Sequence, residues 1–275
     1  MALLSVSTWA LNRQLGPLRW TRWDASRQRP VTVAEPRPQE LPLSALPARL
    51  AAMGLQACEL GHFHLPPLEE ITPALTDEVR AAFSASGVVL WSLLVDYGDL
   101  SSADPRRRDA DRAYIAAWVD VAGALGARHV RVVGGEGSPD DPAAVERAVE
   151  ALGALAERAA ALGVTVLTEN FRRLCSTPDV LTLICTRLKD RVWLTADFGN
   201  FPRPARPSAL AAVLPYARSI HAKVDGTDVA EFHRLLDLAT ASGFDGAYTV
   251  IYEGPDDQWA GIERTSRLIR EHLPA

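Results

Sequence analysis

Cysteine is scarce in this chain. The 275 residues include three cysteines, Cys58, Cys175 and Cys185, which are odd in number and lie far apart in the sequence. Secreted domains that depend on disulfide bonds usually carry many closely spaced cysteines in even number. The sequence therefore argues against a disulfide framework and favours a reducing compartment, so we expect a cytoplasmic protein.

Long apolar runs are also absent. No uninterrupted apolar stretch approaches the roughly 18 residues that a membrane-spanning helix requires. The first residues, MALLSVSTWALNRQ, lack the basic start of a secretory signal, and their apolar part is too short for one. We therefore expect neither secretion nor a membrane partner.

The chain has no excess of positive charge. Its formal net charge is −5 and its pI is about 5.7, whereas nucleic-acid-binding proteins usually have a basic balance or a basic face. This balance argues against nucleic acid as a partner. Hydrophobic residues make up 48% of the chain and charged residues 23%, which is ordinary for a soluble globular protein with a large core.

Eight short apolar runs alternate with stretches whose apolar residues recur at helical spacing. Several of these helical stretches end at a glycine, which commonly terminates a helix. Continuous apolar runs are typical of parallel strands that are buried on both faces. The expected strands lie within residues 3–11, 55–63, 87–97, 129–135, 164–171, 192–199, 219–226 and 247–254.

This alternation predicts a (β/α)₈ TIM barrel, an α/β fold that occupies residues 1–275 as a single domain. Each strand–helix unit has about 34 residues, close to the repeat length of such barrels. The alternative is a doubly wound open sheet. That fold would require a nucleotide-binding fingerprint after the first strand, and the sequence has none there.

One stretch interrupts the alternation. Residues 12–42, after the first expected strand, are rich in proline, arginine and tryptophan. A connection of this length in a compact domain is usually a functional loop or a disordered one. We expect a long loop insertion on the active-site face. It is either a lid, with Trp20 and Trp23 as its apolar side chains, or a mobile segment without a role.

The late strands end in groups that can bind a metal. Glu169, Asp197, His221 and Glu253 fall at corresponding positions of four consecutive expected strands, which place them on one rim of a parallel barrel. Three carboxylates together repel one another strongly, and a divalent cation removes that repulsion. Taken singly, such a glutamate could pair with an arginine and such a histidine could belong to the core. Together they predict a site for Mn²⁺, Mg²⁺, Co²⁺ or Zn²⁺, with Mn²⁺ favoured.

The segments LTEN, ADFGN, IHAK and IYEG, together with CELGHF on the second strand, resemble the xylose isomerase-like TIM barrels. This family includes sugar isomerases, ketose 3-epimerases, inosose dehydratases and hydroxypyruvate isomerases. The resemblance implies that Glu169, Asp197, His221 and Glu253 hold the metal. It also implies that Glu169 and Glu253 act as acid and base on either face of a small sugar or polyol, and that the chain forms a homodimer or homotetramer.

The chain departs from the family pattern at two positions. Many epimerases of the family have a histidine three residues after the strand-six aspartate, where this chain has Asn200. The acid that usually follows the lysine of strand seven is displaced by one residue, to Asp225. Endonuclease IV, a distant member, needs additional histidines for three zinc ions. His129, His233 and His272 lie away from the rim here, so an endonuclease is disfavoured.

Further side chains are expected around the site. Lys223 shares a strand face with His221, and either stabilises an enediolate or forms a salt bridge with Glu169 or Asp197. His62 and His64 either contact substrate or lie in a surface loop. Glu59 either contacts substrate or pairs with an arginine such as Arg131. The expected substrate-binding residues are Asn200, His62, His64, Glu59 and Trp9.

These residues predict a metal-dependent sugar isomerase or epimerase. A cation that chelates a carbonyl and a neighbouring hydroxyl group acidifies the adjacent C–H bond, and a carboxylate then takes the proton. The catalytic residues are Glu169, Glu253 and Lys223. Two alternatives are a dehydratase that expels a hydroxyl group from an inositol-like ketone, and a barrel that binds metal and sugar without turnover.

Overall fold

Eight parallel strands form a closed barrel in the computed structural model, which describes residues 2–224 and 229–272. Neighbouring strands follow the order β1-β10-β9-β8-β7-β6-β5-β4 around the ring. The predicted (β/α)₈ TIM barrel is therefore confirmed. The barrel strands are β1 Leu3–Ser7, β4 Ala57–Gly61, β5 Val89–Val95, β6 His129–Val132, β7 Thr165–Glu169, β8 Val192–Asp197, β9 Ala217–Lys223 and β10 Ala247–Ile251.

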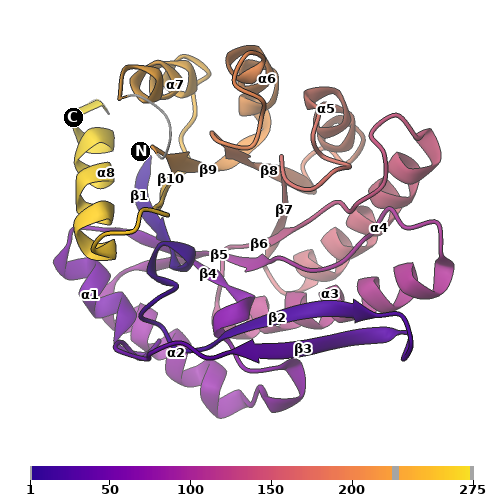
Figure 1. The fold of residues 1–275 in the computed structure, drawn as a ribbon, viewed down its shortest axis with the longest axis horizontal. Helices are drawn as coiled ribbons and strands as arrows, with labels where there is room; N and C mark the ends of the chain where they lie inside the picture. The colour runs from indigo at the N-terminus through magenta and orange to yellow at the C-terminus, as the bar shows by residue number, and fades with distance from the viewer. Residues whose placement is uncertain (1, 225–228, 273–275) are drawn as a thin grey trace.

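Helices surround the barrel and cover its outer face (Figure 1). Six of them have proline in the first or second position, where a missing backbone N–H costs no helical hydrogen bond. The helices are α1 Leu46–Ala52, α2 Pro73–Ser86, α3 Pro105–Leu125, α4 Pro142–Ala161, α5 Pro178–Arg187, α6 Arg206–Val213, α7 Val229–Ala241 and α8 Gln258–His272.

The core is continuous from the barrel strands to the inner faces of the helices. In β5, every residue after Val89 is buried, as expected for a strand that is covered on both faces. Trp118 of α3 and Phe232 of α7 are among the largest fully buried side chains. This packing fixes the strands, and hence the positions of the side chains at their ends.

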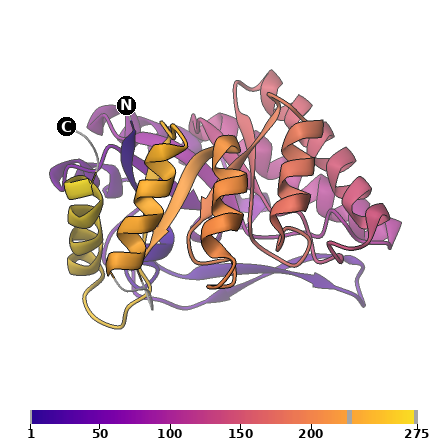
Figure 2. The same ribbon diagram turned by 90° about the horizontal axis from the view of Figure 1, so that it is seen from above.

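The insertion after β1 contains a β-hairpin, which the sequence analysis did not predict. Its strands, β2 Leu18–Asp24 and β3 Arg29–Glu35, pair with each other and not with the barrel. At the turn, Asp24 Oδ1 accepts hydrogen bonds from the backbone N–H groups of Ser26 and Arg27 at 2.9 and 3.0 Å. The hairpin crosses the carboxyl end of the barrel strands (Figure 2).

The hairpin is docked on the barrel at a defined place. The hydroxyl group of Tyr114, on α3, lies 3.0 Å from Thr21 Oγ1 and 3.4 Å from Thr32 Oγ1, one threonine from each strand. Trp20 Nε1 also donates a hydrogen bond to Glu35 Oε2 at 3.0 Å across the two strands. These contacts give the hairpin a fixed orientation over the barrel mouth.

The three cysteines are free and buried. Within the described residues, no helix has the length and apolar character needed to cross a membrane. Asp225, at which the family pattern is displaced by one residue, lies outside the described residues.

Candidate active site

Three of the four expected metal ligands come together in one buried group. Glu169 ends β7, Asp197 ends β8, and His221 lies two residues before the end of β9. One donor atom from each lies within 4.8 Å of the others. Within residues 2–224 and 229–272, this is the one such group of histidine, cysteine or acidic side chains. We call Glu169, Asp197 and His221 the ligand triad.

The imidazole of His221 is held from behind by a carboxylate. Its Nδ1 faces the triad, 3.5 Å from Glu169 Oε1 and 3.6 Å from Asp197 Oδ2. Its Nε2 lies 2.6 Å from Glu59 Oε2, and the hydroxyl group of Ser219 donates to Glu59 Oε1 at 2.5 Å. Metal-binding histidines commonly use their second nitrogen in this way, because the bond fixes the ring and its tautomer.

Carboxylates around His221 create a negatively charged environment that favours a cation. Burial alone would lower the pKa of His221, but the carboxylates of Glu59 and Glu169 raise it well above its ordinary value. Burial alone would raise the pKa of Asp197, but His221 and Lys223 keep it below its ordinary value. A divalent cation would provide the positive charge in place of the imidazole proton. One nitrogen and two carboxylates suit the metals expected from the sequence, so the triad fits such an ion.

Glu253, the fourth expected ligand, is not part of the ligand triad. It follows β10 by two residues, and its Oε1 accepts a hydrogen bond from the indole Nε1 of Trp9 at 2.7 Å. Both side chains line the same cavity as the triad. The structure therefore brings Glu253 to the site but pairs it with Trp9.

Asn200 and Lys223 each contact a member of the triad. Asn200 Nδ2 donates to Glu169 Oε1 at 3.2 Å, and Lys223 Nζ lies 3.3 Å from Asp197 Oδ2. Burial alone would lower the pKa of Lys223, but the charges of Asp197 and Glu253 raise it above its ordinary value. The salt bridge that the sequence offered as one role of Lys223 is therefore present, with Asp197 as the partner.

Arg131 holds the second oxygen of Glu169 and is a residue that the sequence analysis placed elsewhere. Its Nε lies 3.0 Å from Glu169 Oε2, and its Nη1 donates a hydrogen bond to Asp96. The expected pairing of Arg131 with Glu59 is not found, because Glu59 faces His221 and Ser219 instead. Arg131 is 3% exposed, so its two carboxylate partners are what make its burial tolerable.

Asn170 was missed by the sequence analysis, although it directly follows Glu169. Its Oδ1 accepts the backbone N–H of Asp197 at 2.7 Å, and its Nδ2 donates to the backbone carbonyl of Asp197 at 2.9 Å. The side chain thus ties the end of β7 to the end of β8. Further along, the backbone N–H of Gly199 donates to Asp197 Oδ1 at 2.6 Å, which fixes that carboxylate as well.

His62 and His64 do not line the cavity, nor do they lie in an exposed loop. Both belong to the buried 3₁₀ turn His62–His64 and are 2% and 3% exposed. The ring of Phe63, between them, lines the cavity instead. Burial lowers the pKa of each histidine to about 4. Glu59 is also absent from the cavity wall, since it lies behind His221 inside the barrel.

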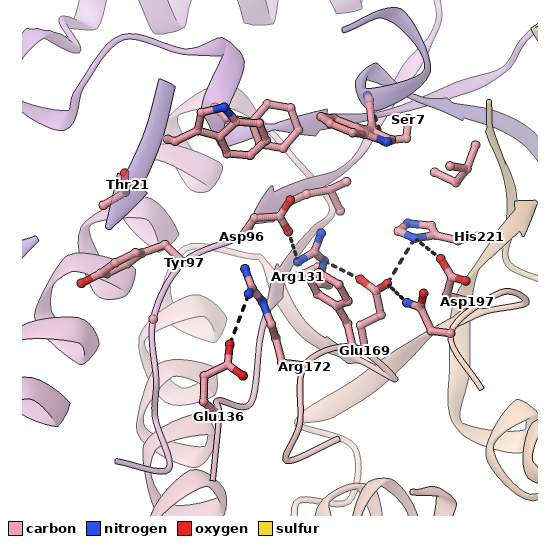
Figure 3. Close-up of a pocket in the computed structure, with 18 of the residues that line it drawn as sticks. Ser7, Thr21, Asp96, Tyr97, Arg131, Glu136, Glu169, Arg172, Asp197 and His221 are labelled. Carbon is pink, nitrogen blue, oxygen red and sulfur yellow. Dashed lines mark hydrogen bonds and ion pairs between the residues drawn. The ribbon is translucent and has the colours of Figure 1, made fainter. Parts of the chain in front are cut away.

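The triad opens into a cavity of about 580 Å³ between the barrel mouth and the hairpin. Trp9, Trp20 and Phe63 form one wall, with ring centroids 5.3 to 6.0 Å apart. Figure 3 shows the polar residues that line the opposite wall, with the triad at one side. The cavity thus combines a polar, metal-compatible end with an aromatic wall.

Comparisons with known proteins identify the family and the fold of the chain. A family model described as "Xylose isomerase-like TIM barrel" matches residues 47–272. No curated protein matches the chain. The matched range includes all members of the ligand triad together with Glu59 and Glu253.

Several solved structures share the fold over almost the whole chain. L-ribulose 3-epimerase is 17% identical, with a TM-score of 0.73 over 99% of this chain and 95% of that one. D-allulose 3-epimerase from Methylomonas sp. is 14% identical, with a TM-score of 0.73 over 99% and 98%. A xylose isomerase-like TIM barrel protein from Mycobacterium smegmatis, solved with magnesium, is 17% identical, with a TM-score of 0.67 over 100% and 98%. Identities this low establish similarity of fold.

Proposed function

Since the chain belongs to the xylose isomerase-like TIM barrel family, we propose that it is a divalent-metal-dependent isomerase or epimerase of a sugar or sugar-like hydroxy ketone. The observation that carries this proposal is the ligand triad, which lies at the carboxyl ends of neighbouring strands and opens into the cavity. Active sites of TIM barrels are built at this end of the strands. The epimerases among the solved structures with the same fold support the choice of reaction.

Glu169, Asp197 and His221 would hold the metal ion, with Glu253 as the fourth ligand from the same cavity. Mn²⁺ is favoured, and Mg²⁺, Co²⁺ or Zn²⁺ would suit the same donors. When bound, such an ion would act as a Lewis acid on the substrate carbonyl and lower the pKa of the adjacent C–H bond. Glu59 would keep His221 Nδ1 directed at this position.

Glu169 and Glu253 would move the proton. Asn200 and Arg131 hold the two oxygens of Glu169, so its carboxylate has a fixed direction. Glu253 lies on another strand end and would serve the opposite face of the substrate. Return of the proton to the same carbon from the other side gives epimerisation, and its return to the neighbouring carbon gives isomerisation. Lys223 would offset charge that develops on the substrate oxygens.

Trp9 and Asn200 would contact the substrate. Asn200 presents an amide at the triad, and Trp9 presents an indole ring beside Glu253. The aromatic wall of Trp9, Trp20 and Phe63 would pack against the apolar face of a sugar ring and keep water from the carboxylates.

Solvent deuterium exchange tests this proposal. The purified protein is incubated in D₂O with a panel of ketoses, with Mn²⁺ or with a chelator, and the sugars are analysed by mass spectrometry and NMR. We expect incorporation of deuterium at the carbon next to the carbonyl, dependent on Mn²⁺ and lost in Glu169→Gln. Loss of water from the substrate would instead identify a dehydratase. Absence of exchange with every sugar would contradict the proposal.

A further inference from the structure

The cavity extends well beyond the ligand triad. In the ring of eight strands, β5 lies diametrically opposite β9, which carries His221. Tyr97 and Gly98, just after β5, line the same cavity as His221. Figure 3 shows Tyr97 and Thr21 on the side of the cavity away from His221 and Asp197. A small sugar bound at the triad would therefore leave the β5 side of the cavity open.

The β5 side of the cavity is cationic. Outside the triad, the cavity is lined by Arg22 of the hairpin, Arg107 of α3 and Arg172, which follows β7. The guanidinium group of Arg107 lies 5.9 Å from the ring centroid of Trp23. Arg172 lines the cavity together with Asp96, the residue that follows β5. We call these three arginines the arginine subsite.

Carboxylates only partly neutralise the arginine subsite. Arg172 Nη1 binds Glu136 Oε1 at 3.2 Å, and Arg107 Nε lies 3.4 Å from Asp111 Oδ2. Although the backbone of Arg22 pairs with Val31 in the hairpin, its side chain has no hydrogen bond or ion pair with the described residues. Asp96, which also lines the cavity, is already bound by Arg131. The arginines thus outnumber the carboxylates that face them.

The donor groups of the arginine subsite also remain largely free. A guanidinium group has five N–H donors in a planar fork, and those of Arg107 and Arg172 each make one contact with a carboxylate. A side-chain N–H at the entrance of a cavity can be satisfied by water. A ligand with two or three anionic oxygens satisfies several of them at once, which is why arginine is favoured at phosphate and carboxylate sites.

The two ends of the cavity therefore have opposite charge. The triad end holds Glu169, Asp197 and Glu253 against Lys223 and Arg131, and Arg131 is shared with Asp96, so acids remain in excess there, which suits a divalent cation. The β5 end holds an excess of arginine, a balance that suits an anion. We infer that the substrate carries an anionic substituent, a phosphate or a carboxylate, which binds the arginine subsite while its hydroxy-ketone end lies at the triad. This inference rests on the proposed function for the reacting end.

Binding measurements separate this inference from the proposed function. Glu169→Gln protein with Mn²⁺ is titrated calorimetrically with D-fructose, D-fructose 6-phosphate, D-fructuronate and inorganic phosphate. We expect the two acidic sugars, or one of them, to bind at least about tenfold more tightly than D-fructose. Preference for the phosphate or the carboxylate then identifies the anionic group.

Matched variants locate the effect. Arg22→Gln should remove most of the preference for the acidic sugar, and it should not disturb folding, because the Arg22 side chain has no partner within residues 2–224 and 229–272. Arg29→Gln removes the same charge from the exposed end of β3, outside the cavity, and should leave the preference unchanged. Arg172→Gln should act as Arg22→Gln does.

Equal affinity for the neutral and acidic sugars would overturn the inference, as would equal effects of Arg22→Gln and Arg29→Gln. Deuterium exchange in the wild-type protein reports separately on the reaction. Tight binding of an acidic sugar that requires Arg22, without exchange into any sugar, would support the arginine subsite and contradict the proposed function. Exchange into neutral ketoses alone, without preferential binding of the acidic ones, would support the proposed function and contradict the arginine subsite.

Discussion

At the scale of single residues, the position of His221 depends on a carboxylate that never reaches the cavity. Glu59 is fully buried in β4 and binds Nε2 of the imidazole, while Nδ1 faces the triad. Burial alone would raise the pKa of Glu59, but the charge of His221 lowers it below its ordinary value. Glu59 is therefore ionised and fixes the orientation of the imidazole, with Nδ1 directed at the triad.

Glu59→Gln should weaken Mn²⁺ binding about 10- to 100-fold, as is typical when the partner of a ligating histidine is removed. The amide keeps the size of the side chain but removes the charge that orients the ring. Calorimetric titration with Mn²⁺ measures the change. Glu157→Gln, whose side chain is 72% exposed on α4, is the control and should bind like the wild type. Unchanged affinity in Glu59→Gln would show that His221 does not need this partner.

A second prediction at the residue scale concerns the contribution of Asn170 to stability. Asn170→Ala leaves the backbone N–H and carbonyl of Asp197 without these partners in a buried position, which should lower the free energy of unfolding by roughly 1–3 kcal/mol. Asn200→Ala loses one hydrogen bond at a half-buried position and should cost less than about 1 kcal/mol. Urea unfolding of both variants measures the difference. Equal losses would argue against the tie between β7 and β8.

At the scale of elements, the hairpin determines the shape of the cavity. Trp20, Thr21, Arg22 and Trp23 of β2 all line it, and Tyr114 fixes both strands on α3. Of the two alternatives for residues 12–42, a lid or a mobile segment without a role, this position favours the lid, which stays a prediction. The alternating pattern of RWTRW and VTVA is typical of strands. The sequence analysis did not identify these strands, because the prolines and arginines around the alternating pattern are more common in loops.

Trp20→Ala should raise KM for the ketose that undergoes exchange by about 3- to 10-fold, because it removes one ring of the aromatic wall. The turnover number should change much less, since Trp20 has no contact with the ligand triad. Val33→Ala, on the paired strand and 60% exposed, is the matched control and should leave KM unchanged. Similar KM values for Trp20→Ala and the wild type would contradict a role of the hairpin in binding.

The element scale also explains what the sequence could predict of the site. Glu169 and Asp197 were predicted because strand ends of a parallel barrel share one rim, and apolar runs locate those ends. The pairing of Arg131 with Glu169 and the role of Asn170 were missed because these partners lie on neighbouring strands, and the register between strands is not visible in one sequence. Glu59 was assigned to substrate binding because the sequence does not show where β4 ends. In the structure Glu59 lies in the middle of that strand, inside the barrel.

At the scale of the whole molecule, the alternating pattern was sufficient to predict the barrel. The eight strands occur where the apolar runs predict them, and the family suggested by LTEN, ADFGN, IHAK and IYEG is confirmed by the match to residues 47–272. The direction of the charged side chains relative to the barrel axis could not be predicted from the sequence and was seen only in the structure. This difference is general, since burial patterns specify faces of strands but not the pairing of side chains across them.

The buried histidines predict how stability depends on pH. Burial lowers the pKa of His129 to about 4, as it does for His62 and His64, from an ordinary value of 6.5. Such a group contributes full stability above the unfolded value near 6.5, and this contribution is lost as the pH falls toward 4. His129→Phe, which keeps a ring against Trp91, should reduce the loss of unfolding free energy between pH 7 and pH 5 by about 1 kcal/mol.

Urea unfolding of the wild type and His129→Phe at both pH values measures this effect. Comparing the two proteins isolates His129 from His221, whose raised pKa acts in the opposite direction. The stability contributed by His221 is present at low pH and is lost as the pH rises through its folded value. An identical pH dependence in the two proteins would show that His129 does not titrate as a buried neutral group.

The most direct test of the account is anomalous scattering at the manganese absorption edge, from crystals grown with Mn²⁺. The account predicts one strong peak bounded by Glu169, Asp197 and His221, and its loss in crystals of Asp197→Asn. A protein without a peak at that position, or with Mn²⁺ bound elsewhere, would contradict the assignment of the ligand triad as a metal site and with it the proposed chemistry.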